Sequence, residues 1–82
     1  MVLRILFFSV LRDVVGCEEL EFEAPGTVHN VGELLDALYQ QWPSLRGWQQ
    51  QIRVAVDLDY VGLEHLLKEG QEIAIMPPVQ GG

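Results

Sequence analysis

A helical pattern between residues 30 and 43 constrains the fold more than any other feature of this 82-residue sequence. Asn30 is a residue type that often caps helices, and Glu33 follows three positions later, close to a capping box. Pro43 is expected to end the helix. A chain of this length forms one domain at most, so we interpret the apolar stripe of this helix as one side of a single hydrophobic core. The stripe recurs at helical spacing and consists of Val31, Leu34, Leu35, Leu38 and Trp42.

Two segments before the helix alternate as strands do. The segment 2–8, VLRILFF, places Leu3, Ile5 and Phe7 on one face and leaves a second face that is only partly apolar. The segment 19–24, ELEFEA, alternates apolar residues with glutamates, which predicts a half-buried strand with a charged outer face. The intervening SVLRDVVG is expected to form a short helical turn or a loop, so the two strands are predicted to pair antiparallel.

Further strand candidates follow the helix, after SLRGWQQQ, which is expected to be an irregular connection. They are the segments 52–56 (IRVAV) and 72–76 (EIAIM), with a short candidate at 60–61 between them. This order of elements predicts an α+β domain whose mixed sheet packs against one main helix and contains a parallel pair. A β-grasp, the ubiquitin-like fold, has this order. We expect this domain over residues 1–76 and an extended C-terminal tail over residues 77–82.

Composition and charge exclude several classes of function. The net charge of −7, from 12 acidic and 5 basic residues, argues against nucleic-acid binding and favours docking onto a basic partner. No apolar run approaches the roughly 18 residues of a membrane span, and the first residues lack a signal-peptide pattern, so a cytoplasmic protein is expected. Cys17 is the one cysteine, and His29 and His65 stand far apart, so neither a disulfide within the chain nor a metal site is predicted.

The best candidate for chemistry is the end of the sequence, IMPPVQGG, because no catalytic triad motif or phosphate-binding glycine loop occurs elsewhere. Pro77 and Pro78 cannot extend a sheet ladder and favour a stiff, extended backbone. Gly81 and Gly82 have no side chains, so they can enter a narrow channel. The α-carboxylate of Gly82 needs activation: ATP could convert it to an acyl-adenylate, from which sulfide would give a thiocarboxylate and a lysine amine an isopeptide bond. A flexible terminus with no role is the alternative.

The ending PPVQGG, after the predicted strand EIAIM, resembles that of the small, sulfur-carrier subunit of molybdopterin synthase. The segments LFFSVLRDVVG, TVHNVGELLDALYQQWP and VAVDLDYV are also similar to this family, so the resemblance covers nearly the whole chain. It implies a β-grasp fold and a C-terminal thiocarboxylate that donates sulfur to cyclic pyranopterin monophosphate, which builds the dithiolene of molybdopterin. The small subunit alone is not expected to be catalytic.

The resemblance also implies partners and residue roles. An E1-like adenylyltransferase would use ATP to adenylate Gly82, a sulfur donor would then load it, and no cofactor would be bound permanently. The tail would insert into the large synthase subunit, in an assembly of two small and two large subunits, with Gly81 supplying clearance. Phe8 and Met76 lie on the faces of their strands opposite the predicted core, and they are predicted to contact this partner. The other residues expected to line the inserted tail are Pro77, Pro78, Val79 and Gln80.

Some positions depart from the pattern of that family. Gln71 follows Gly70 where Gly-Asp is commoner, and Asp57 stands where Asn is often found; both changes are expected to alter turn details only. Gln80 stands where Ser or Thr is common, and Met76 stands where an aromatic residue is often found. Both positions lie near the expected partner surface, so these two changes affect the details of partner contact. Three alternatives remain: a sulfur carrier for thiazole synthesis, although such carriers tend to lack the double proline; a ubiquitin-like modifier that conjugates to lysines; and an interaction domain with an idle tail.

Overall fold

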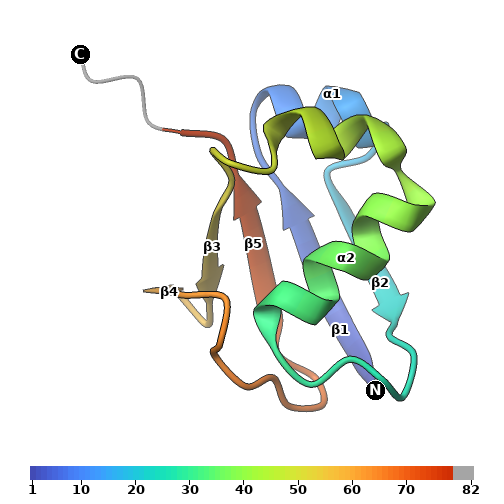
Figure 1. Cartoon of the computed structure of the whole chain (residues 1–82), viewed down its shortest axis with the longest axis vertical. Coiled ribbons are helices and arrows are strands. Elements are labelled where there is room, and N and C mark those ends of the chain that lie inside the picture. The colour runs from blue at the N-terminus through green and yellow to red at the C-terminus, as the bar shows by residue number, and fades with distance from the viewer. Residues whose placement is uncertain (79–82) are drawn as a thin grey trace.

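The computed structural model describes residues 1–78 and shows a mixed sheet with a helix packed across one face (Figure 1). The strand order in the sheet is β2-β1-β5-β3-β4. This arrangement confirms the mixed sheet and main helix expected from the sequence. In chain order the elements are β1 (Val2–Phe7), α1 (Val10–Val15), β2 (Glu19–Glu23), α2 (Val31–Gln41), the 3-10 helix η1 (Pro43–Trp48), β3 (Arg53–Val56), β4 (Asp59–Val61) and β5 (Glu72–Met76).

β1 lies between β2 and β5, so it pairs with a strand from near each end of the chain. Leu3, Ile5 and Phe7 are buried against the apolar stripe of α2, as their alternation predicted. β1 runs antiparallel to β2, with Leu3 opposite Phe22, which confirms the expected pair. It runs parallel to β5, with Ile5 opposite Ile73, so the first and last strands of the domain lie side by side. This pairing supplies the parallel pair predicted from the order of the elements.

The other half of the sheet is a small hairpin attached to β5. β3 runs antiparallel to β5, with Ala55 opposite Ala74. β4 then pairs with β3 and places Tyr60 opposite Ala55, which confirms the short strand expected near residue 60. Two residues, Asp57 and Leu58, connect β3 to β4, and their φ angles of 49° and 77° are both left-handed. Positive φ at both positions is typical of the two-residue turn that matches the twist of a hairpin.

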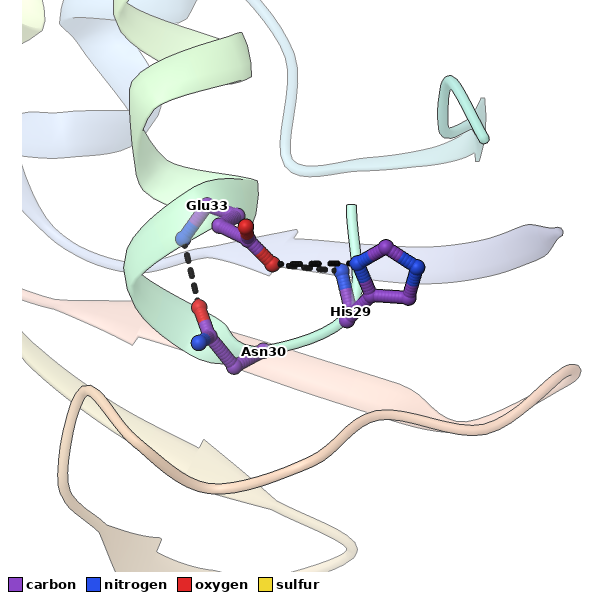
Figure 2. A network of polar contacts seen from close by, with 3 residues as sticks. All are labelled: His29, Asn30 and Glu33. Carbon is purple, nitrogen blue, oxygen red and sulfur yellow. Dashed lines mark hydrogen bonds and ion pairs between the residues drawn. The ribbon is translucent and has the colours of Figure 1, made fainter. Parts of the chain in front are cut away.

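The start of α2 is held by a reciprocal cap (Figure 2). The Oδ1 atom of Asn30 accepts a hydrogen bond of 2.8 Å from the backbone N–H of Glu33. The carboxylate of Glu33 in turn accepts one of 2.8 Å from the backbone N–H of His29, one residue further back than in a standard capping box. Carbonyl groups in the loop of residues 63–65 accept the first two N–H groups of the helix, at 3.0 and 2.9 Å. The cap therefore leaves few unpaired donors at this end of α2.

The segment after α2 differs from the irregular connection expected there. Pro43 does end the helix, but it also begins η1, because a proline at the first position has its φ angle already set for a helical turn. Leu45 of η1 is fully buried, and Trp42 packs edge-to-face on Phe7 with 5.9 Å between ring centroids. One buried residue, Leu45, and one partly buried residue, Trp48, in a six-residue helix leave no periodic signal, which explains why this element was not predicted.

The remaining helix, α1, is short and ends at Gly16. This glycine has a φ of 91°, and its N–H donates to the carbonyl of Arg12 at 2.8 Å. A left-handed residue at this position is a common way for a helix to end, and glycine adopts it without a Cβ clash. Within residues 1–78, no helix combines the length and the apolar character needed to cross a membrane.

Candidate functional site

The face of the sheet turned away from α2 is lined by small and apolar side chains. Because side chains alternate along each strand, the residues between the core positions of β1, β3 and β5 point to this side. The register aligns Leu6, Ala74, Ala55 and Tyr60 in one row across four strands. The row borders a shallow hollow of about 200 Å³. We call this surface the open sheet face; it consists of Leu6, Phe8, Ala55, Leu58, Tyr60, Glu72, Ala74 and Met76.

Large apolar side chains stand around the small residues at the centre of the open sheet face. Leu58 is 90% exposed, Tyr60 65% and Phe8 45%. The hydroxyl of Tyr60 lies 3.9 Å from the sulfur of Met76, at the length of a weak O–H···S hydrogen bond. Clustered exposed apolar side chains on a small domain are typical of a protein–protein contact surface. The open sheet face is therefore the candidate interaction surface of this chain.

The last described residues leave the sheet at the border of this surface. β5 lies between β1 and β3, and its Ile75 carbonyl accepts the N–H of Phe8 at 3.1 Å. Met76, the last residue of β5, lies opposite Arg53. Pro77 and Pro78 follow and belong to no strand, which agrees with the expectation that prolines, lacking an N–H, end the ladder.

The structure brings two of the predicted site residues together. Phe8 and Met76 line the same hollow on the open sheet face, although 68 positions separate them in the sequence. Their contact with a partner stays a prediction. The other predicted tail residues, Val79, Gln80, Gly81 and Gly82, lie outside the described residues.

The charges on the same side of the sheet are mainly acidic. The edge strand β2 presents Glu19, Glu21 and Glu23 outward, all exposed. Arg4 forms a 2.6 Å ion pair with Glu19 and lies opposite Glu21 and Glu72 in the register. With the net charge of −7, this acidic border favours a partner with a basic surface.

Several members of the open sheet face were not predicted from the sequence. The sequence places Leu58 in a turn and Tyr60 in a short strand, puts Ala74 on the same strand face as Met76, and does not single out Ala55. The signal for Ala74 was available, because it lies between Ile73 and Ile75, which share the buried face. For Leu58 there was no such signal, since its exposure depends on the turn geometry.

Two other positions of chemical interest lie away from this surface. Tyr39 on α2 is buried, and its hydroxyl has no hydrogen-bond partner among the described residues. Burial raises the pKa of Tyr39, the charge of Asp36 raises it further, and Arg46, 5.6 Å above the ring, opposes both. Cys17 is half-buried at the edge of the core. Among residues 1–78, no three His, Cys, Asp or Glu side chains gather closely enough to hold a metal ion.

Fold and surface together define a β-grasp domain, and solved structures confirm this class. The crystal structure of SAMP1 from Haloferax volcanii is similar with a TM-score of 0.81 and 26% identity, covering 100% of both chains. A protein–protein complex of subunits 1 and 2 of molybdopterin-converting factor from Helicobacter pylori contains a chain with a TM-score of 0.69 and 26% identity, again covering 100% of both chains. These similarities confirm the ubiquitin-like β-grasp fold predicted from the sequence.

Sequence comparison extends the assignment from the fold to a family. The model of the ThiS family matches residues 5–82. The molybdopterin synthase sulfur carrier subunit of Mycobacterium tuberculosis is 37% identical over 82 aligned residues, which cover 96% of this chain and 95% of that relative. The chain belongs to the ThiS family, among the molybdopterin synthase sulfur carrier subunits.

Proposed function

We propose that this chain carries sulfur on the terminal carboxylate of Gly82 and delivers it within a molybdopterin synthase. The observation that carries this proposal is the similarity to a relative named molybdopterin synthase sulfur carrier subunit, which spans nearly the whole of both chains. The family match also extends to residue 82, so it includes the Gly-Gly ending. Sulfur transfer in the synthesis of the molybdenum cofactor is the role that these similarities support.

The proposed chemistry has three steps. A carboxylate oxygen of Gly82 attacks the α-phosphorus of ATP on an E1-like adenylyltransferase, which forms the acyl-adenylate and releases pyrophosphate. Sulfide (HS⁻) supplied by a donor then attacks the carbonyl carbon, AMP leaves and the proton is lost, so the product is a thiocarboxylate. Its sulfur attacks a carbon of cyclic pyranopterin monophosphate in the large subunit and displaces an oxygen substituent, which forms a thioester. Water then cleaves the bond between the Gly82 carbonyl carbon and the sulfur, which leaves the sulfur on the pterin and restores the carboxylate. ATP belongs to the activating enzyme, so the carrier needs no permanent cofactor.

The division into a body, residues 1–76, and a tail, residues 77–82, is part of this proposal. Six extended residues reach about 20 Å, long enough to enter a partner while the body stays on its surface. The absence of a side chain at Gly81 and Gly82 suits a narrow channel, and Pro77 and Pro78 reduce the entropy that is lost when the tail is ordered. Val79 and Gln80 would line the same channel.

The open sheet face is the proposed docking surface for the large subunit. It is apolar at its centre and acidic at its border, and Phe8 and Met76 lie on it beside the exit of the tail. The Helicobacter pylori complex of subunits 1 and 2 supports a partner of this kind. An assembly of two small and two large subunits in the cytoplasm completes the proposal, and both details remain predictions.

Mass spectrometry tests the carrier role directly. After incubation with the activating enzyme, ATP and a sulfur donor, the intact chain should exchange one oxygen for one sulfur. The loaded chain and the large subunit should then convert the pyranopterin precursor. Deletion of Gly82 should abolish both reactions without changing the thermal denaturation of the body. If the wild-type chain gains no sulfur from an active enzyme, the carrier proposal is wrong.

A second function is favoured by one observation. SAMP1 of Haloferax volcanii is a small archaeal modifier protein, and its structure is similar to this chain over the full length. A modifier would transfer its activated Gly82 carbonyl to a lysine amine, which forms an isopeptide bond. The last basic residue before the ending is Lys68, so tryptic peptides of cell protein in which a lysine carries residues 69–82 as an isopeptide-linked remnant would support this function. A thiazole-synthesis carrier, the remaining alternative, would instead supply sulfur to thiazole formation and leave the pyranopterin unchanged.

A further inference from the structure

The turn between β3 and β4 holds a large apolar side chain in an unfavourable backbone conformation. Asp57 and Leu58 both have positive φ angles, of 49° and 77°. Aspartate tolerates this region, whereas leucine rarely adopts it because its Cβ approaches the following carbonyl. Leu58 is nevertheless 90% exposed, so no packing within the described residues compensates for the strain. Strained, exposed residues of this kind gather at binding surfaces.

The side chain of Asp57 ties this turn to the segment that enters β5. Its Oδ1 atom accepts the backbone N–H of Glu72, and its Oδ2 atom accepts the side-chain amide of Gln71, each at 3.3 Å. The backbone N–H of Asp57 donates to the Glu72 carbonyl at 3.0 Å. The amide oxygen of Gln71 accepts the N–H of Lys68 at 2.7 Å, which leaves its nitrogen to face Asp57. We call this set of contacts the turn clamp.

We infer that Asp57 is a positioning residue for partner docking, which acts through Gln71 and Glu72 to hold Leu58 on the rim of the open sheet face. The hairpin of β3 and β4 is short and lies at an edge of the sheet, and within residues 1–78 its contacts with β5 and the turn clamp hold its tip. Leu58, which follows Asp57 in the turn, and Glu72, a member of the clamp, border the same hollow. If the contacts of the turn clamp were weakened, a smaller fraction of molecules would hold Leu58 on the rim of the open sheet face, where the partner would bind it.

The effect on binding follows from that fraction. The apparent dissociation constant equals the intrinsic one divided by the fraction of competent molecules, so a fall from nearly all to about one fifth weakens binding about fivefold. Asp57→Ala removes both side-chain acceptors and also disfavours positive φ, so we expect a five- to tenfold rise in Kd, on the order of the effect of one ordinary hydrogen bond that is lost. This inference rests on the proposed docking of the open sheet face onto the large subunit.

Two conservative substitutions test whether the hydrogen bond between Asp57 and Gln71 affects binding, as opposed to a general structural role of Asp57. Asp57→Asn keeps the tolerance for positive φ and one acceptor, but its amide nitrogen then faces the amide nitrogen of Gln71. Gln71→Glu, added to it, supplies a carboxylate that can accept both the introduced amide and the N–H of Lys68. Calorimetric titration with the purified large subunit should therefore give a Kd about threefold higher for Asp57→Asn and near wild type for the double variant.

Asp57→Ala can be measured both in the wild-type chain and in a chain that already carries Leu58→Ala. The comparison shows whether Asp57 acts by positioning Leu58 or contacts the partner directly. If Asp57 acts through Leu58, Asp57→Ala should cause no further loss in a chain that already carries Leu58→Ala. A further loss of equal size in that background would overturn the inference, as would an unchanged Kd for Asp57→Ala alone. Phe8→Ala serves as the test of the docking surface itself. If both Asp57→Ala and Phe8→Ala leave Kd unchanged, the docking proposal fails. If Phe8→Ala weakens binding and Asp57→Ala does not, only the clamp inference fails. Thermal denaturation of each variant verifies that the domain remains folded.

Discussion

Replacement of Leu58 by alanine should weaken binding to the large subunit while leaving the stability of the domain almost unchanged. Leu58 stands at the tip of the β3–β4 hairpin on the rim of the open sheet face and is 90% exposed. Because so little of its side chain contacts the rest of the chain, its truncation should lower the free energy of unfolding by less than about 0.5 kcal/mol. Its apolar surface is therefore available almost entirely for a partner.

The size of the binding loss follows from the atoms removed. Leucine to alanine removes three carbons, worth about 2.4 kcal/mol when fully transferred from water at about 0.8 kcal/mol each. Scaled by the 90% exposed fraction, about 2 kcal/mol is available, which corresponds to roughly a 30-fold increase in Kd. Docking that covers only half of the side chain would give about 1 kcal/mol, or roughly fivefold.

The chain offers a matched control for this measurement. Leu66 is also exposed, at 66%, but its backbone bridges to Asn30 at the start of α2, away from the open sheet face. Titration calorimetry should therefore show a Kd for Leu66→Ala within about twofold of wild type, since surface changes outside an interface have small effects. An unchanged Kd for Leu58→Ala, with the fold intact by circular dichroism, would refute docking through the open sheet face.

Three further outcomes are expected from the same fold. Asn30→Ala should lower the free energy of unfolding in urea by about 1 kcal/mol, because the N–H of Glu33 loses its acceptor, whereas Asn30→Ser should retain most of it. Equal losses in both would contradict the capping role. Ile75→Ala should cost about 2–5 kcal/mol by the same assay, since Ile75 is fully buried; a loss below that of Asn30→Ala would contradict its place in the core. The raised pKa of Tyr39 means that the unfolded chain loses the phenolic proton first, so stability should be complete below about pH 10 and fall above it. Tyr39→Phe should reduce that fall in thermal denaturation at alkaline pH.

Local patterns in the sequence predicted the main elements. Alternation in the first strand identified Leu3, Ile5 and Phe7 as core residues, and all three are buried. The cap at Asn30 was predicted because its bond to Glu33 spans three residues and needs no knowledge of the fold. Both signals are short-range, with periods set by the geometry of strands and helices.

Contacts between distant segments could not be predicted in this way. Asp57 and Gln71 were each expected to alter turn details only, yet the structure places their side chains 3.3 Å apart. Likewise η1 escaped prediction because one buried residue, Leu45, anchors it. In both cases the deciding contact is tertiary and leaves no periodic trace in the sequence.

The sequence by itself therefore determined the alternating faces of the strands, the stripe and cap of α2, the end of the sheet at Pro77 and the Gly-Gly ending on which the proposed chemistry rests. Only the tertiary structure decided that Phe8 and Met76 share one hollow, and that Leu58 and Tyr60 border it. The physical reason is that a strand specifies which of its side chains lie on the same face, whereas strand order and register decide which strands contribute to that face.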